Sequence, residues 1–220
     1  MKKALTIVAI VLAVLVGLGV VADRGAVAVA QNAISDRVQQ ELPGAASVET
    51  EIDGFPVLTQ AARGSLDHVT VRMREVPTEQ GTLDSVTVDL YDVTTGEPRT
   101  AGRIEARAVV PLDVLQAQIG DSWEVAVDGD ALTASFTGAV PVEATVVPVV
   151  RDGAITVDIR SISLLGVDIA GDSIPGFVTE ALQGLIGSIG PLPFDLTPDS
   201  VVVTEFGVEV AASGTDVALG

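Results

Sequence analysis

The chain has 220 residues, a formal net charge of −18 and no cysteine, and its only lysines are Lys2 and Lys3. Such an acidic chain repels the phosphate backbone of nucleic acids, so nucleic-acid binding is a poor interpretation. The missing cysteines exclude disulfides and thiol catalysis, and the lack of lysine after Lys3 excludes a phosphate-loop nucleotide site and Schiff-base chemistry.

An uncharged, mostly apolar segment from Ala4 to Ala22 follows the two lysines. Cations before a long apolar stretch are typical of an export signal, because the cations stay cytoplasmic while the apolar segment enters the bilayer. Its length is close to the roughly 20 residues of a membrane-spanning helix, which favours an anchor, whereas the small residues ending at Ala22 would suit a signal peptidase. We therefore expect residues 1–22 to be a signal peptide or a membrane anchor helix. Residues 23–220 would form one exported domain.

A helix is predicted directly after this segment. From Arg24 to Leu42 the apolar residues recur every three or four positions, which gives one apolar stripe on an amphipathic helix. Pro43 and Gly44 end the pattern. A helix that continues from the apolar segment would hold the domain close to the bilayer.

Beyond Pro43 the apolar period changes to two, which predicts antiparallel strands with one apolar and one polar face. The clearest strand patterns are Val69–Met73, Val86–Leu90, Trp123–Val127, Leu132–Phe136, Val146–Val150, Ile155–Ile159, Val201–Thr204 and Val208–Val210. Hairpin turns are predicted at Asp128–Gly129, at Asp152–Gly153 and around Gly207.

Two further helical patterns interrupt the strands, a short one over residues 111–119 and a longer one over residues 174–189. The glycines at positions 184 and 187 weaken the longer helix, because each costs about 1 kcal/mol relative to alanine. Together the elements predict an α+β fold. In this fold a curved, mainly antiparallel sheet packs around amphipathic helices in a single domain.

No residue pattern predicts catalysis or metal binding. His68 is the only histidine and falls on the polar face of its strand, and the G-x-S-x-G pattern of a nucleophile elbow is missing. Asp128-Gly129-Asp130 is explained as a hairpin turn, and one histidine without cysteine cannot supply a tetrahedral zinc site. We therefore expect a protein without enzymatic activity, metal or cofactor.

One local segment is more distinctive than the rest. Residues 54–60 read G-F-P-V-L-T-Q, and residues 64–71 read G-S-L-D-H-V-T-V. This predicts a strand, a Gly-Phe-Pro bend anchored by Phe55, and a second strand. With the preceding Ala22-Asp23-Arg24 and the Ala-rich helix, it resembles the LmeA-like exported lipid-binding proteins of actinobacteria. The specific motifs cover about Val20 to Val93.

The resemblance implies phospholipid binding in the cell envelope and a role in envelope maintenance, linked in that family to mannan elongation. It also implies a fold similar to tubular lipid-binding domains, in which a curved sheet wraps a long helix around a hydrophobic channel. Hydrophobic residues make up 48% of this chain and aromatic residues 3%. The interior is therefore aliphatic, which suits acyl chains and an ordinary core equally well.

We therefore expect a non-catalytic protein that binds or handles phospholipid or another acyl lipid. It would work at the outer face of the cytoplasmic membrane or be released into the envelope space. The predicted apolar lining consists of Phe55, Leu58, Phe177, Val178, Leu182, Leu185, Ile186 and Ile189. The predicted headgroup cations are Arg63, Arg72 and Arg74.

Two other functions remain open from the sequence. One is a structural or interaction domain of the envelope with a solid core, which a ligand-sized cavity of roughly 300–1,000 Å³ would distinguish from the first hypothesis. The other is an acid hydrolase of envelope glycans or lipids, which would need two carboxylates in a cleft, one with a strongly shifted pKa. No residue pattern favours the hydrolase.

Overall fold

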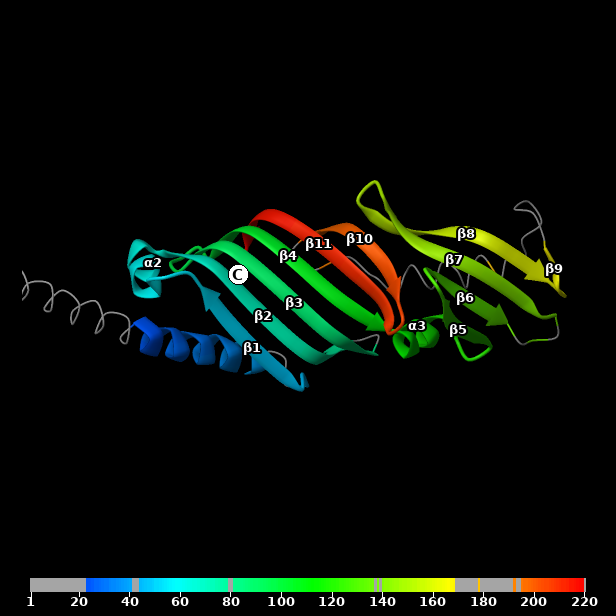
Figure 1. Ribbon diagram of the computed structural model, residues 1–220, viewed down its shortest axis with the longest axis horizontal. Coiled ribbons are helices and arrows are strands. Elements are labelled where there is room, and N and C mark those ends of the chain that lie inside the picture. Colours follow the sequence, from blue (N-terminus) through cyan, green and yellow to red (C-terminus); the bar gives the residue numbers. More distant parts are fainter. Residues whose placement is uncertain are drawn as a thin grey trace, which may run out of the picture.

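The computed structural model describes residues 23–40, 44–78, 81–136, 138, 140–168, 178, 192 and 195–219. Most of this part of the chain forms two open antiparallel sheets that lie one after the other in an elongated molecule (Figure 1). The prediction of a mainly antiparallel fold with a few helices is therefore confirmed. The sequence predicted one curved sheet, whereas the described residues form two, because the strands between residues 123 and 168 pair with one another and not with the other strands. The predicted domain boundary after residue 22 and the single-domain organisation stay predictions.

The larger sheet has six strands in the order β1-β2-β3-β4-β11-β10. Their bounds are β1 (Ser47–Asp53), β2 (Ser65–Thr78), β3 (Gly81–Thr94), β4 (Thr100–Pro111), β10 (Thr197–Thr204) and β11 (Gly207–Ala218). The first four strands follow the chain as a meander. The C-terminal hairpin returns from far along the chain and pairs β11 with β4.

The two faces of this sheet differ because side chains alternate along each strand. Val71 is paired with Val88, Val88 with Ala106, and Ala106 with Ala212, so one face is aliphatic across four strands. The neighbouring row pairs Arg72 with Thr87 and Thr87 with Arg107. We call the aliphatic side the inner face and the polar side the outer face.

Residues 23–40 form the predicted amphipathic helix, which covers part of the inner face (Figure 1). Its stripe of Val27, Ala30, Ile34 and Val38 packs against residues of β1 and β2. These sheet residues are Ile52, Val69, Val71 and Met73. Residues 41–43 of the predicted helix end lie outside the described residues.

A short helix that the sequence did not predict, α2 (Val57–Arg63), fills the corner between β1 and β2. Pro56 precedes its first residue, and Gly64 ends it in the left-handed region with φ 85°. The sequence predicted a simple bend here. The local pattern did not show a helix because Val57–Arg63 amounts to only about two turns.

The smaller sheet has five strands in the order β5-β6-β7-β8-β9 and is preceded by α3 (Leu112–Ile119). The strand bounds are β5 (Trp123–Asp128), β6 (Ala131–Phe136), β7 (Val142–Arg151), β8 (Ala154–Leu164) and β9 (Val167–Asp168). The predicted hairpins at Asp128–Gly129 and Asp152–Gly153 are present between β5 and β6 and between β7 and β8.

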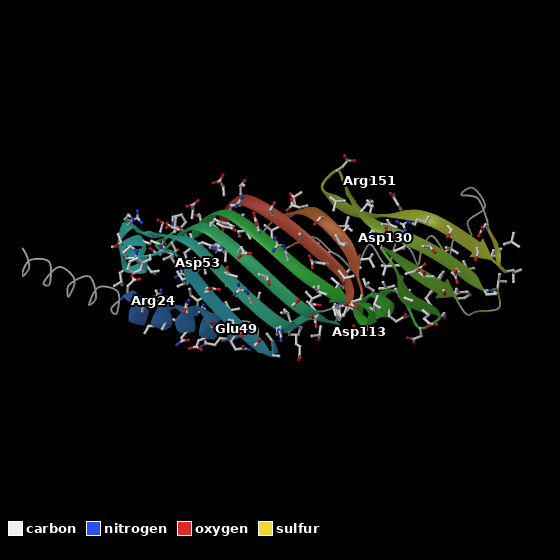
Figure 2. All side chains as sticks on the ribbon, in the orientation of Figure 1. Arg24, Glu49, Asp53, Asp113, Asp130 and Arg151 are labelled. Carbon is white, nitrogen blue, oxygen red and sulfur yellow. The ribbon has the colours of Figure 1, made fainter. Side chains whose placement is uncertain are left out.

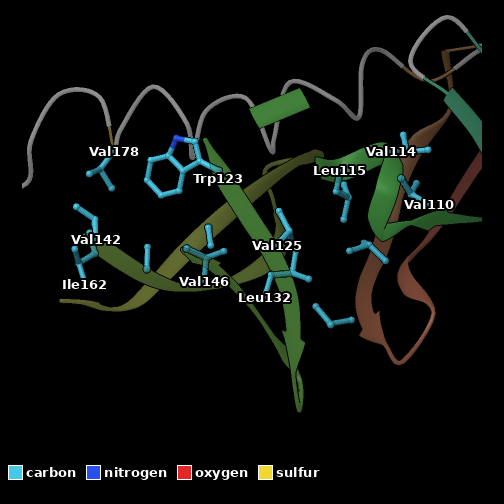
Figure 3. Close-up of a cluster of buried hydrophobic side chains, with 14 of the residues drawn as sticks. Val110, Val114, Leu115, Trp123, Val125, Leu132, Val142, Val146, Ile162 and Val178 are labelled. Atoms are coloured by element: carbon cyan, nitrogen blue, oxygen red, sulfur yellow. The ribbon is translucent and has the colours of Figure 1, made fainter. Parts of the chain in front are cut away.

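One hydrophobic core joins this sheet to α3 and to the end of the larger sheet. Trp123, Val125 and Leu132 belong to it (Figure 3), together with Leu115 of α3 and Val208 of β11. The two sheets are therefore connected by packed aliphatic side chains as well as by the chain.

The predicted helix over residues 174–189 is described only at Val178, which is helical and fully buried in this core (Figure 3). No helix in the described ranges is both long and apolar enough to cross a membrane. The apolar segment of residues 4–22 lies outside those ranges.

Candidate functional site

A groove of about 750 Å³ lies between the helix over residues 23–40 and the inner face of the six-stranded sheet. We call it the inner groove. The residues that line it are Ala33, Ile34, Arg37, Val38, Leu66, Val69, Val71, Leu90, Val93, Thr94, Thr95, Arg99 and Leu219. Its volume falls within the range of about 300–1,000 Å³ that is usual for small-molecule sites.

The sheet leaves aliphatic surface accessible in this groove. Leu90 and Val93 belong to β3, which has a strand on each side, yet both side chains are only half-buried. Val69 and Val71 on the neighbouring β2 are buried. Contact with water instead of an apolar partner costs about 25 cal/mol of free energy per Å² of aliphatic surface. The groove is therefore suited to an aliphatic ligand.

Two arginines and two threonines form the polar part of the groove. Arg37 comes from the helix, whereas Thr94, Thr95 and Arg99 come from the β3–β4 hairpin. The Thr94 hydroxyl donates to Pro98 O at 3.0 Å and accepts from Thr100 N at 2.7 Å, which orders the hairpin.

The backbone at Arg99 is also held, because Leu219 N donates to Arg99 O at 2.9 Å. Its exposed guanidinium Nε is 3.6 Å from a carboxylate oxygen of Glu97. Both side chains of this ion pair are exposed, so the pair is weak. The Arg99 guanidinium can therefore leave Glu97 and bind another anion.

The three cations predicted for a headgroup do not come together at this groove. Arg63 is exposed in the last turn of α2, and Arg72 and Arg74 are exposed on β2. Arg72 Nη1 donates to Glu51 Oε2 at 2.9 Å, and this hydrogen bond raises the pKa of Arg72. Neither Arg72 nor Arg74 lines the inner groove, because both lie on the outer face.

The cations that do line it are Arg37 and Arg99, which the sequence analysis missed. A signal existed for Arg37, which borders the apolar stripe at Ile34 and Val38 of the predicted helix. Arg99 lies in a hairpin, where no periodic pattern applies.

The predicted apolar lining is also placed differently. Phe55 and Leu58 are exposed at the α2 corner and do not line the inner groove. Val178 is buried in the core of the five-stranded sheet. Phe177, Leu182, Leu185, Ile186 and Ile189 lie outside the described residues. The period-two pattern did contain the residues that line the groove, because it assigned Val69, Val71 and Leu90 to the apolar faces of their strands.

His68 lies on the outer face, between two carboxylates. Its Nδ1 is 2.7 Å from Asp53 Oδ2, at the α2 end of β1 (Figure 2), and its Nε2 is 3.1 Å from Asp89 Oδ1. Its ring stacks on Tyr91 with 4.5 Å between the centroids. With both ring nitrogens engaged by carboxylates, His68 is arranged as a cross-strand contact and not as the base of a serine nucleophile. Within the described residues no group of three or more His, Cys, Asp or Glu side chains could hold a metal ion.

The profile of a family described as LmeA-like phospholipid-binding matches residues 21–213. The chain belongs to this LmeA-like family. The match covers the helix, all the groove-lining residues except Leu219, and most of both sheets, so it extends well beyond the motifs between Val20 and Val93. The searches of curated proteins and of solved structures returned no match.

Proposed function

We propose that this chain binds a phospholipid in the inner groove and handles lipid in the cell envelope without catalysing a reaction. The observation that carries the proposal is the half-buried aliphatic surface of β3 beneath the helix, in a chain whose family is described as phospholipid-binding. A solid-cored interaction domain would have no such groove to fill.

The aliphatic residues would hold an acyl chain. Leu66, Val69 and Val71 of β2 lie opposite Ile34 and Val38 of the helix across the groove. Each methylene group that leaves water for this surface would contribute about 0.8 kcal/mol. A chain of ordinary lipid length would thus be bound mainly by aliphatic burial, without a specific polar contact.

The two groove arginines would hold the phosphate. A guanidinium can donate two parallel hydrogen bonds to a phosphate, which an ammonium cannot match in geometry. The formal net charge of −18 repels anionic lipid surfaces in general. Recognition of a phosphate therefore depends on local cations such as Arg37 and Arg99.

The site of action in this proposal is the outer side of the cytoplasmic membrane or the envelope space. The support is the sequence of residues 1–22, two lysines before an apolar segment, which is typical of export. A domain near the membrane surface could take up lipid from it.

The groove can be tested by filling it. In Leu90→Trp the larger side chain would occupy space along half-buried β3, and we expect several-fold less phospholipid to co-purify than with the natural chain, as measured by mass spectrometry of extracted lipid. Val202→Trp is the matched control, because Val202 is exposed on β10 and lies outside the groove.

Circular dichroism establishes that each variant is folded, and Val93→Phe is a second filling variant in case Leu90→Trp does not fold. A natural chain that carries no lipid and does not take up phospholipid from vesicles would refute the proposal. That result would favour the interaction domain.

A further inference from the structure

We propose that Phe55 and Leu58 form a membrane-docking corner that rests on the surface of a phospholipid bilayer. This surface is distinct from the inner groove, and the inference does not require the groove to hold lipid. It concerns the end of the elongated molecule where α2 and the start of the described helix lie together (Figure 1).

The corner presents large apolar side chains to solvent. Phe55 is 59% exposed and Leu58 is 46% exposed, although the aromatic content of the chain is only 3%. Scattered exposed apolar residues are normal on protein surfaces, but neighbouring ones at a protruding end are a feature of interaction sites. Exposure alone does not identify the partner, so the construction of the corner and its surroundings carry the argument.

A buried polar framework holds the corner in this orientation. Gln60 is 2% exposed, and its Oε1 accepts from Asp67 N at 2.8 Å while its Nε2 donates to Asp53 O at 3.4 Å. Gly54 has φ 93°, and a Cβ at this position would collide with Gln60 Nε2. The same framework that joins β1, α2 and β2 therefore turns Phe55 and Leu58 outward.

The corner is also fixed to the residue that follows the apolar segment. Asp23 is 2% exposed, and its Oδ1 accepts from Leu58 N at 2.7 Å. Asp23 comes directly after Ala22, where a stretch long enough to enter a bilayer ends. The chain therefore reaches the corner at the same point at which its membrane-compatible sequence stops. If the apolar segment of residues 4–22 enters a bilayer, Phe55 and Leu58 lie next to the point where the chain leaves it, so a bilayer is the partner we infer for them.

The charges around the corner are compatible with lipid headgroups. Arg24 (Figure 2) and Arg63 are exposed, while Asp23 is buried under the Leu58 amide. Among the acidic groups nearby, Asp53 is held by His68 at 2.7 Å and Asp67 is exposed. At a bilayer surface the exposed arginines could contact the lipid phosphates while the apolar side chains contact the upper part of the acyl chains.

Docking at this corner would bring the inner groove to the bilayer. Thr95 N donates to Gly64 O at 2.9 Å, so the β3–β4 hairpin lies against the end of α2. Thr95 and Arg99 of this hairpin line the groove. The part of the groove that contains Arg99 therefore lies at the same end of the molecule as Phe55 and Leu58.

The natural absence of cysteine allows one label at a time to report on the membrane. Full-length Phe55→Cys carries an environment-sensitive nitrobenzoxadiazole label and is reconstituted with vesicles of phosphatidylcholine and phosphatidylglycerol. Phe206→Cys is the matched control, because Phe206 is 70% exposed in the β10–β11 turn. Val167→Cys, at a position that is 65% exposed in β9, reports on the opposite end of the molecule.

We expect the label at position 55 to shift its emission to shorter wavelength and to be quenched by nitroxide-labelled acyl chains. The quenching should be several-fold stronger than at positions 206 and 167. Equal quenching at all three positions, or stronger quenching at 167, would overturn the inference. Leu58→Cys gives a second reading of the same corner if Phe55→Cys does not fold.

A label at position 55 in the Leu90→Trp variant separates this inference from the proposed function. Quenching that persists while co-purified lipid is lost shows docking that is independent of the groove. If the label at position 55 is not quenched in a chain with Leu90 unchanged that still co-purifies with lipid, docking is refuted and the proposed lipid site in the groove is unaffected.

Discussion

Gln60 joins three segments through one buried side chain. It accepts from the backbone of β2 at Asp67 and donates to the backbone of β1 at Asp53, while its own backbone is part of α2. Gly54 is required beside it because any Cβ there would collide with the amide. The G-F-P-V-L-T-Q motif is therefore explained by Gly54 and Gln60 as a structural unit.

Replacement of Gln60 by leucine should destabilise the fold by about 1–3 kcal/mol, because it leaves the Asp67 N–H and the Asp53 carbonyl without their partner. Unfolding in urea followed by circular dichroism measures the change. Gln40→Leu is the control, since Gln40 is exposed on the helix and should change stability by less than about 0.5 kcal/mol. Equal effects of the two substitutions would contradict the role assigned to Gln60.

The sequence predicted that Phe55 anchors this bend, whereas the structure leaves Phe55 exposed and buries Gln60. Hydropathy predicts that a phenylalanine is buried more often than a glutamine, which is the usual order. It gives no information on the direction in which a turn points a side chain. That direction depends on Gly54 and on the amide contacts that join residues of β1 and β2. A local pattern therefore could not place the corner.

The helix over residues 23–40 forms one wall of the inner groove and contributes one of its two cations. Its apolar stripe was predicted correctly because a period of three to four is local information. The pairing of β11 with β4 could not be predicted in this way, since residues far apart in the chain meet there. Arg99 was missed for the same reason, because its position depends on how the β3–β4 hairpin meets the groove.

Substitution of both groove arginines, Arg37→Gln with Arg99→Gln, should weaken binding of a fluorescent anionic phospholipid several-fold while the unfolding midpoint changes little. Both side chains are exposed, and substitutions of exposed residues usually change stability by less than about 0.5 kcal/mol. The matched control is Arg72→Gln with Arg74→Gln on the outer face, where the same loss of charge should leave binding nearly unchanged. Equal weakening in both pairs would show that only net charge matters.

At the scale of the molecule, the two sheets share the core that contains Val110 of β4 and Trp123 of β5 (Figure 3). Lipid bound on the inner face of one sheet should therefore stabilise both. The period-two pattern predicted both sets of strands, but it could not show that they divide into two sheets. Sheet order depends on long-range pairing, for which a single sequence contains no direct signal.

Removal of bound lipid should lower the midpoint of thermal unfolding of the natural chain, because a ligand that binds only the folded state stabilises it. At a free concentration about 100 times the dissociation constant this amounts to about 2.7 kcal/mol. Calorimetry before and after delipidation measures the change. The groove-filled Leu90→Trp variant should respond little, and an equally large response in that variant would place the lipid elsewhere.

The hydrogen bond from Leu58 N to Asp23 would also limit where a protease could remove the N-terminal segment without disturbing the domain. A protease that cut after Ala22 would leave a mature chain whose first residue is Asp23, with its carboxylate still available to α2. A cut one residue later would remove this carboxylate and leave the Leu58 amide without its acceptor. We therefore expect a chain cut after Ala22 to keep the α2 corner, whereas loss of Asp23 should loosen this corner before it affects the sheets.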